Sequence, residues 1–481
     1  MCCLSHRGPR SPSAAAGLGG TATRKCGGTP SPYPPIASCG GVDLGQDQPS
    51  LAGSDPEDSR LSAMIDTFSS DLQLDEHTLE IPYVAGPENA GVSVTDLCAI
   101  PSLLDEQAIE LPSWAFGNSG TRFRVFPPAG MARNVFEKIE DAAQVHKYTG
   151  LAPRVALHIP WDTTENYRAL REHAENQGVA LGTINSNTFQ DEDYRLGSLT
   201  HSDPEVRRKA IDHHFSCIEI MDEIGARDLK IWLADGTSCP GQGDISSRQQ
   251  WLAESLHRIY ERLSKHQRLV LEYRSFGPAF FHTDVPDWGT AYAHVSALGE
   301  RAIVCLGTGH HAPGTNIEFI VAQLLRLGKL GSLNFNSRRY ANDDLSVGAA
   351  DPFQLFRILF EVVRGGGYGC HSTVAFMLDQ CHNVEDKISG QIRSVLNVQE
   401  MTARALLVDQ RALESAQSKG DVLAANSIYM DAFYTDVRPV LAAWRDSRGL
   451  PADPLNAYAS SGYGAEIAKT RLGGVQATWV A

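Results

Sequence analysis

Cysteine is sparse in this chain: 10 of the 481 residues are cysteines, and no C-x-x-C spacing occurs. Secreted disulfide scaffolds use cysteine more densely and in shorter chains, so we expect reduced thiols and predict a cytoplasmic protein. Long apolar runs are missing as well, since no stretch approaches the roughly 20 residues that a membrane helix requires. We therefore expect no membrane partner.

The chain has fewer positively charged than negatively charged residues. The chain has 42 Lys and Arg residues against 57 Asp and Glu residues, which gives a formal net charge of −15. This balance disfavours nonspecific binding to nucleic acid, and we predict no nucleic-acid partner. No G-x-G-x-x-G motif follows a strand-like run, which argues against an open dinucleotide-binding sheet. What remains is the composition of an ordinary globular protein, with 42% hydrophobic and 21% charged residues.

The first 60 residues are rich in Gly, Pro, Ser and Ala and lack the apolar periodicity of a buried core. We predict a disordered N-terminal arm over residues 1–60. Its basic, acid-free beginning loosely suggests a transit peptide. A leader without function, or a true start at about Met64, is the favoured alternative. Residues 61–111 mix acidic and apolar residues and are predicted to form a docking segment.

Strand-like and helix-like patterns alternate from residue 112 onward. The predicted strands are 121–126, 155–161, 179–185, 228–236, 268–274, 302–306, 331–335 and 374–379. The predicted helices between them are 135–148, 164–177, 203–224, 248–265, 289–299, 315–328 and 352–364. The helix at 203–224 has Asp203 as its N-cap and Pro204 as the next residue. Eight strands alternating with helices predict an α/β protein with a (β/α)₈ TIM barrel over residues 112–386.

Helix-like, amphipathic sequence continues beyond the predicted barrel, over residues 388–418 and 421–445. We predict a helical C-terminal extension over residues 387–481. An added helical layer of this kind packs on the barrel or on a neighbouring subunit, so we expect a homo-oligomer.

Several predicted strands end in residue types that bind metal ions. The candidates are Glu272, His310, Asp344 and Asp379, with His158 and Asp235 on earlier strands. Catalytic side chains of a TIM barrel lie at the C-terminal ends of its strands, so these residues should form one rim. Carboxylates suit magnesium and manganese, and manganese also accepts imidazole. Each candidate alone is as often a helix cap or salt-bridge partner, but their gathering on one rim predicts a divalent-metal site.

The histidine pairs and three of the tryptophans can be interpreted either as structural residues or as residues of a functional site. The pair His310 and His311 lies in a loop, where histidines more often hydrogen-bond carbonyl groups than bind metal. His213 and His214 lie within a predicted helix, so a structural role is favoured there. Three tryptophans near strand ends suit either the core or the apolar wall of a sugar site. They are Trp114, Trp161 and Trp232.

Four longer motifs lie along the predicted barrel: VALHIPWD at 155–162, HTDVPDWGT at 282–290, GHHAPGTNIE at 309–318 and FMLDQCHN at 376–383. They resemble motifs of the L-rhamnose isomerases of the broad-specificity bacterial type. The resemblance covers residues 111–464. It implies a xylose-isomerase-like barrel, usually tetrameric, that interconverts L-rhamnose and L-rhamnulose by means of two divalent metals, commonly manganese.

The same resemblance implies roles for individual residues. The structural metal would be held by Glu272 and Asp379, with the positions of Gly307 and Asn334. The catalytic metal would be held by His310 and Asp344, with the position of Asn342. The substrate would contact Trp114, His158, Trp232 and Phe123, the last as an aromatic that reaches a neighbouring subunit's pocket. The expected catalytic set is Glu272, Asp379, Arg274 and His158.

Four positions depart from the family pattern. Gly307 and Asn342 stand where the family has Asp, Asn334 stands where it has His, and Arg274 replaces a lysine. Glycine supplies no ligand, and an amide oxygen does not neutralise a dication as a carboxylate does. Arginine is bulkier than lysine and is not a proton donor at neutral pH.

Three functional hypotheses are compatible with these departures. The first is a metal-dependent aldose–ketose isomerase whose activity is weak or lost. The second is a catalytically inactive sugar-binding or assembly subunit on the same fold. The third is a sugar epimerase on the same barrel.

Overall fold

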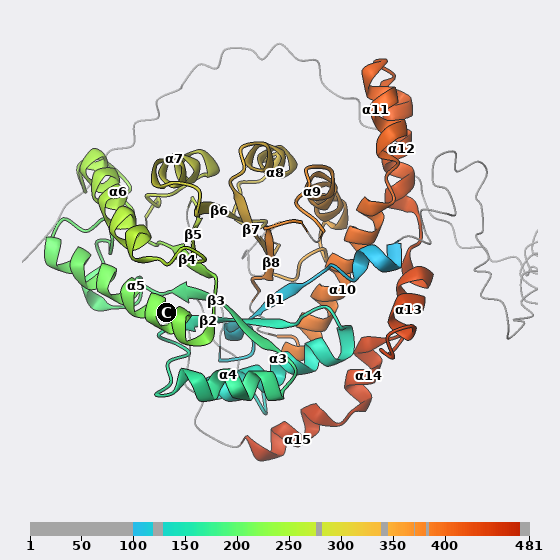
Figure 1. Cartoon of the computed structure of the whole chain (residues 1–481), viewed down its shortest axis with the longest axis horizontal. Helices are drawn as coiled ribbons and strands as arrows, with labels where there is room; N and C mark the ends of the chain where they lie inside the picture. Colours follow the sequence, from blue (N-terminus) through green and yellow to red (C-terminus); the bar gives the residue numbers. More distant parts are fainter. Residues whose placement is uncertain are drawn as a thin grey trace, which may run out of the picture. The chain divides into compact units, whose positions relative to one another are not determined.

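Eight parallel strands close into a barrel in the computed structural model of this chain, and helices surround it (Figure 1). The structure describes residues 100–118, 128–275, 281–337, 345–369, 371–380 and 384–471. The strands are β1 (Ile109–Pro112), β2 (Arg154–Ile159), β3 (Ala180–Ser186), β4 (Asp228–Trp232), β5 (Arg268–Glu272), β6 (Ala302–Gly307), β7 (Leu330–Phe335) and β8 (Ala375–Leu378). The predicted α/β barrel is confirmed.

One long helix follows each strand along the chain. These helices are α3 (Val135–Thr149), α4 (Tyr167–Asn176), α5 (Pro204–Ile224), α6 (Ile245–Arg262), α7 (Trp288–Leu298), α8 (Ile317–Arg326), α9 (Pro352–Arg364) and α10 (Lys387–Leu406). Helix α10 packs against both α9 and α3, so it completes the outer ring of the barrel. The barrel predicted from the sequence ends at residue 386, before this helix begins. The domain limits stay predictions.

The first strand lies earlier in the chain than the sequence pattern suggested. Strand β1 pairs in parallel with β2 and with β8, and this pairing closes the barrel. The run 121–126, predicted as the first strand, lies outside the described residues, and the barrel closes without it. The assignment of the first strand was therefore wrong. Strand β1 has four residues, and Glu110 in its middle interrupts the apolar pattern that would have marked it.

Capping residues set the limits of α5. The Asp203 side chain accepts a hydrogen bond from the backbone N–H of Glu205, and Pro204 is the first residue of the helix, as predicted. The helix ends at Gly225, whose φ of 75° is a left-handed conformation that glycine adopts at little cost. This helix covers the outer face of the sheet beside β3 and β4.

Strand β4 shows how alternation divides the barrel into an outer core and an inner cavity. Leu229 and Ile231 belong to the main apolar core between the strands and the helices. Each fully buried aliphatic side chain of this kind contributes about 1.5–3 kcal/mol to stability. Lys230 and Trp232 lie on the opposite face of the strand and line a cavity inside the barrel. On this strand the outer face therefore carries core residues and the inner face carries residues that line the cavity.

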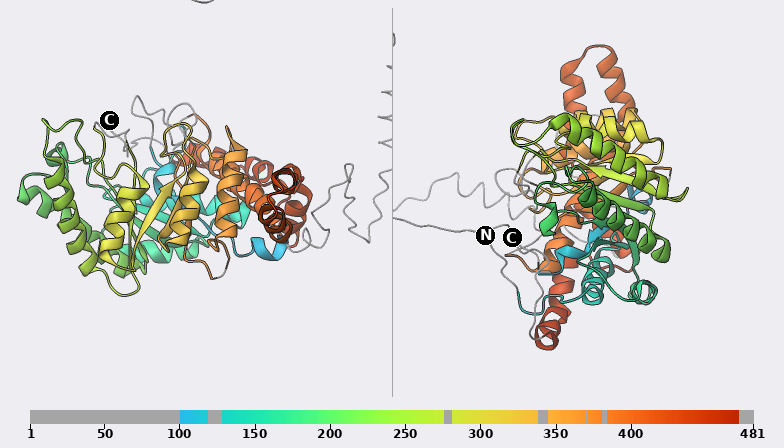
Figure 2. Two further views of the ribbon diagram at one scale, coloured as in Figure 1. Left: turned by 90° about the horizontal axis from the view of Figure 1, so that it is seen from above. Right: turned by 90° about the vertical axis from the view of Figure 1, so that its left-hand side faces the viewer.

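Up to residue 471, where the description ends, five further helices follow the barrel: α11 (Gln410–Ser418), α12 (Val422–Tyr434), α13 (Arg438–Asp446), α14 (Pro454–Ser460) and α15 (Tyr463–Thr470). Helices α11 and α12 pack against each other and extend beyond the ring of barrel helices (Figure 2). Val422, Leu423 and Tyr434 on α12 are exposed. The predicted homo-oligomer stays a prediction. Nowhere in the described ranges is a helix both long enough and apolar enough to span a membrane.

Candidate active site

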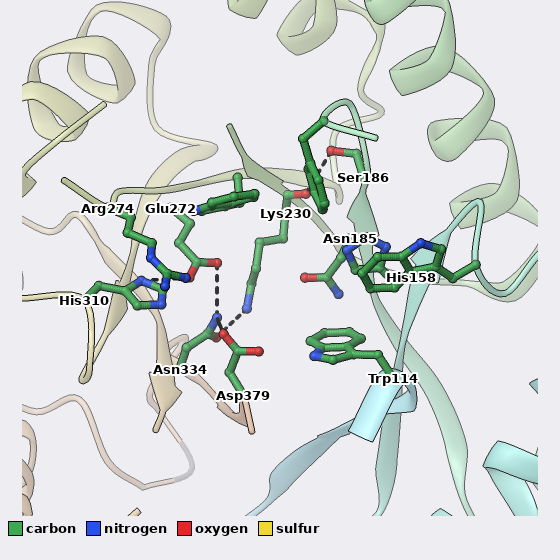
Figure 3. Close-up of a pocket in the computed structure, with 13 residues that line it drawn as sticks. Trp114, His158, Asn185, Ser186, Lys230, Glu272, Arg274, His310, Asn334 and Asp379 are labelled. Carbon is green, nitrogen blue, oxygen red and sulfur yellow. Dashed lines mark hydrogen bonds and ion pairs between the residues drawn. The ribbon is translucent and has the colours of Figure 1, made fainter. Parts of the chain in front are cut away.

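A cavity opens inside the barrel, at the level where the strands end (Figure 3). Residues from all eight strands, or from the segments directly after them, form its wall. They are Trp114, His158, Trp161, Asn185, Ser186, Phe189, Lys230, Trp232, Glu272, Arg274, His310, Asn334 and Asp379. The structure thus brings nine of the residues that sequence reasoning selected into one cavity. Phe123, Asn342 and Asp344 lie outside the described residues, so their predicted roles stay predictions.

One side of the cavity holds a cluster of possible metal ligands. Glu272 ends β5, His310 follows β6 and Asp379 follows β8. One ligand atom from each of these residues lies within 4.8 Å of the other two. Nδ1 of His310 is 3.2 Å from Oε1 of Glu272. Two carboxylates and an imidazole that converge in this way match the ligand types that manganese accepts.

Burial and mutual repulsion govern the charge of this cluster. Burial, and then the neighbouring Asp379 carboxylate, raise the pKa of Glu272 to about 7, although the positive charges of Lys230 and Arg274 oppose the shift. Burial, together with the nearby Arg274, holds the pKa of His310 well below its usual range. His310 is therefore neutral at physiological pH, which is the protonation state in which imidazole binds a metal.

Lys230 lies in the middle of the cavity, between the ligand cluster and the aromatic wall (Figure 3). It projects inward from β4 and is only 2% exposed. Burial favours the neutral amine, but the nearby acidic groups Cys305, Glu272, Glu110 and Asp379 outweigh it and raise the pKa of Lys230. The cavity therefore contains a buried ammonium group, which sequence reasoning did not select as a site residue.

Asn334 connects Lys230 to the two carboxylates. Its Oδ1 accepts a hydrogen bond of 2.6 Å from Nζ of Lys230. Its Nδ2 donates to Glu272 Oε2 at 3.1 Å and approaches Asp379 Oδ2 at 3.5 Å. An ammonium group has only donors, so the amide oxygen must face Lys230 and the amide nitrogen must face the carboxylates. The prediction that Asn334 is a metal ligand stays a prediction, and in this arrangement its oxygen is already engaged.

Gly307 leaves room for the ring of His310. A Cβ atom built on Gly307 would come within 2.6 Å of Cε1 and 2.7 Å of Cγ of the His310 imidazole, and closer still to Nδ1. Contacts this short require the ring to move. The missing side chain at 307 is therefore tied to the position of His310 beside Glu272, and an Asp at this position would meet the same obstacle.

We expect Gly307→Ala to lower the free energy of unfolding by about 1–3 kcal/mol, since adding a methyl group to a filled interior forces neighbouring side chains to shift. Denaturant unfolding followed by fluorescence measures this change. Gly241→Ala is the matched control, because a Cβ at Gly241 has no atom within 4 Å. Equal stability of the two variants would show that the His310 ring has a second position at no cost.

Aromatic rings form the opposite side of the cavity. The His158 ring stacks on Trp161 with centroids 3.8 Å apart, and it meets the edge of Trp114 at 5.3 Å. Phe189 meets Trp232 edge-on at 4.9 Å. Flat apolar rings of this kind suit the C–H groups on one face of a sugar ring.

Two polar atoms in this aromatic wall are buried without a hydrogen-bond partner among the described residues. They are Nδ1 of His158 and Nε1 of Trp232. Buried polar atoms in proteins are almost always hydrogen-bonded, so an orphaned pair within one cavity wall calls for an explanation. Burial holds the pKa of His158 well below its usual range, so its ring is neutral. A bound ligand with several hydroxyl groups would satisfy both atoms.

Asp162 fixes the aromatic wall from behind. Its carboxylate accepts hydrogen bonds from Nζ of Lys138 at 2.6 Å and from the backbone N–H of His158 at 2.7 Å. It also accepts a short hydrogen bond from the hydroxyl of Ser113, the residue that precedes Trp114. Asp162 and Lys138 are both buried. The buried ion pair of Asp162 and Lys138 thus connects helix α3 to the two segments that carry His158 and Trp114.

Other candidates from the sequence have structural roles. Asp235 is buried and accepts hydrogen bonds from the backbone and hydroxyl groups of Ser198 and Thr200. His311 does not line the cavity, and its Nε2 lies 2.7 Å from the Tyr273 hydroxyl.

The histidine pair of α5 also fits the structural reading. His214 is fully buried, with Nδ1 2.7 Å from the carbonyl oxygen of Ala210. Its Nε2 lies 3.0 Å from the hydroxyl of Ser186, which lines the cavity. His214 therefore supports the cavity wall from outside the barrel.

Comparison with known proteins gives a consistent result. A protein of Rhizobium meliloti named as a probable sugar isomerase is 39% identical over 382 residues, which cover 78% of this chain and 89% of that protein. One of Mesorhizobium japonicum with the same description is 40% identical over 379 residues, 78% of this chain and 88% of that protein. The chain belongs to the same family as these sugar isomerases. The xylose isomerase of Thermus thermophilus is 25% identical over 274 residues, 53% of this chain and 68% of that enzyme. No protein-family model matches the chain.

Sequence reasoning missed four residues of this sugar isomerase cavity: Asn185, Ser186, Phe189 and Lys230. The sequence held a signal for two of these four residues. Asn185 ends a predicted strand, which is the criterion that selected Glu272. Lys230 lies two residues before Trp232 in the same strand, so the two side chains must share a face.

Proposed function

We propose that the chain is a metal-dependent sugar isomerase that interconverts L-rhamnose and L-rhamnulose, with manganese as the divalent ion. The observation that carries the proposal is that one cavity joins the cluster of Glu272, His310 and Asp379 to an aromatic wall with an unpartnered nitrogen on His158. The two similar sugar isomerases support the reaction class. The motifs at 155–162 and 309–318 support the choice of sugar.

Glu272, His310 and Asp379 would hold the ion. They supply three ligand atoms close enough to converge, and a divalent ion would compensate the repulsion between the two buried carboxylates. A bound ion polarises the sugar oxygens and stabilises the negative charge that develops on them during hydrogen transfer.

The reaction needs no oxidant or second substrate. Conversion of the aldose to the ketose moves one hydrogen from C2 to C1 and one proton from O2 to O1. The protein must therefore hold C1, C2 and their oxygens in one orientation and keep water away from them. The stacked rings of His158 and Trp161 form a wall that serves both requirements.

Arg274 and His158 differ in what they offer the sugar. The Arg274 charge influences both Glu272 and His310, and the side chain lines the same cavity. A guanidinium is a planar group with several hydrogen-bond donors, so Arg274 orients a sugar oxygen by hydrogen bonding. The neutral ring of His158 hydrogen-bonds a sugar hydroxyl through Nδ1, with Trp232 donating nearby through Nε1.

The direct test is to incubate the purified protein with L-rhamnose in the presence of MnCl₂ or EDTA and to separate the products by chromatography. We expect L-rhamnulose with manganese and none with EDTA. An epimer of the input sugar as the main product would favour the epimerase alternative. Equal product formation with EDTA would contradict the proposed role of the metal.

A second candidate is a noncatalytic sugar-binding or assembly subunit. Its support is that Asn334 already donates to Glu272 while Lys230 holds the amide in place, so the cluster has partners without an ion. This candidate predicts that L-rhamnose raises the thermal midpoint by mass action while no product accumulates in any metal. Product formation under the same conditions excludes it.

A further inference from the structure

Lys230 is the charged group nearest the centre of the cavity. Its aliphatic part runs along the inside of the barrel, and Nζ lies 3.8 Å from the Met377 sulfur and 2.6 Å from the Asn334 oxygen. The ligand cluster lies to one side of this ammonium group and the aromatic wall to the other (Figure 3). A charge this deeply buried is costly unless it is paired and hydrogen-bonded, and Asn334 supplies a hydrogen bond to it here.

The hydrogen bonds around Asn334 limit what the site can bind. With Lys230 in place, the amide presents N–H groups to Glu272 and Asp379, and an N–H group does not bind a cation. Turning the amide over would free its oxygen but would set N–H groups against the Lys230 ammonium. Asn334 is thus prevented from acting as a metal ligand for as long as Lys230 remains charged.

The charge balance leads to the same conclusion. The two carboxylates of the cluster, Glu272 and Asp379, carry at most two negative charges. Lys230 and Arg274 already supply two positive charges in the same cavity. One divalent ion adds two more, and a second would add another two with no further acidic side chain of the described residues lining the cavity. The four side chains already balance, so one divalent ion leaves an excess of two positive charges and a second ion leaves four, and among the described residues the second ion is the more strongly disfavoured.

We propose that Lys230 is a built-in cation that takes the place of one of the two metal ions implied by the resemblance, so that the site operates with a single divalent ion. The inference rests on the proposed function only in taking a divalent ion as the cofactor. It makes Lys230 a positioning residue, because its ammonium fixes Asn334 and keeps cations other than the one ion out of the inner end of the cluster.

Manganese binding without sugar tests this inference. Equilibrium dialysis against MnCl₂, followed by metal analysis, gives the number and affinity of ions for wild type, Lys230→Met and Lys230→Gln. We expect one ion per wild-type chain. Both variants should bind the first ion at least tenfold more tightly, because a like charge has been removed. Lys230→Gln keeps a hydrogen-bonding group for Asn334, so the test stands even if Lys230→Met does not fold.

Lys209→Met is the control for a general charge effect, since Lys209 is an exposed lysine on α5 that contacts Asp191 and Asp193. Its manganese affinity should equal that of wild type. The inference is overturned by two ions per wild-type chain, by unchanged affinity in both Lys230 variants, by an equal gain in Lys209→Met, or by no binding in any of the four proteins. Tighter binding without isomerase activity would instead refute the proposed function and leave the role of Lys230 standing.

Discussion

Replacing Glu272 by glutamine is expected to lower kcat about 1,000-fold, since losing about 4 kcal/mol of transition-state stabilisation by the metal corresponds to that factor. Glu272 supplies a ligand atom of the metal cluster and contacts both His310 and Asn334. The amide keeps the shape of the carboxylate but carries no charge. Steady-state assays of L-rhamnose conversion at saturating manganese measure the change.

The thermal midpoint of Glu272→Gln shows whether a loss of activity comes from the loss of a metal ligand or from damage to the fold. Burial and Asp379 raise the pKa of Glu272, so the ionised carboxylate is unfavourable where it lies, and an uncharged amide should not lower the thermal midpoint. Glu254→Gln on the exposed face of α6 is the matched control and should leave kcat unchanged. If Glu272→Gln kept more than a tenth of wild-type turnover, Glu272 would not be a ligand that the reaction needs.

Asp162→Ala is expected to lower the free energy of unfolding by about 3–5 kcal/mol, the usual cost of leaving one member of a buried ion pair alone. The substitution strands the Lys138 ammonium, which is 3% exposed at its side chain. It also removes the acceptor for the backbone N–H of His158 and for the Ser113 hydroxyl. Urea unfolding at constant pH measures the loss.

Two further variants show whether the stranded charge is the cause. Lys138→Met combined with Asp162→Ala should recover part of the loss, because no charge then remains buried alone. Asp193→Ala breaks an exposed pair with Lys209 and should cost no more than about 1 kcal/mol. A loss below 1 kcal/mol for Asp162→Ala itself would mean that water reaches Lys138 and that the pair does not hold the wall.

Most of the barrel could be predicted from sequence because its strands and helices carry strong periodic signals. Seven strands and all seven helices between the predicted strands lie within a few residues of their predicted limits. The first strand failed for a physical reason. Glu110 in β1 is stabilised by hydrogen bonds from the backbone and hydroxyl of Thr183, and a contact between positions 73 residues apart leaves no local pattern. The run at 121–126, in which Phe123 and Val125 alternate with arginines, resembles a strand more closely than β1 does.

The site could be predicted in part, since metal-binding residue types at strand ends identify Glu272, His310 and Asp379 without any structure. The way in which the side chains of the site lie relative to one another could not be predicted. The sequence shows that Gly307 lacks a side chain, but only the structure shows that the His310 ring lies where that side chain would begin. A lysine in a strand usually faces solvent, and only barrel closure shows that Lys230 faces inward and holds Asn334.

The account depends most directly on whether the cluster of Glu272, His310 and Asp379 binds the ion that supports turnover. Titrating metal-free protein with MnCl₂, with bound ion and L-rhamnulose formation measured on the same samples, tests this in one experiment. We predict that turnover rises in proportion to bound manganese up to one ion per chain, and that Glu272→Gln shows neither binding nor turnover in that range. Turnover without bound manganese, or undiminished binding and turnover in Glu272→Gln, would contradict the account.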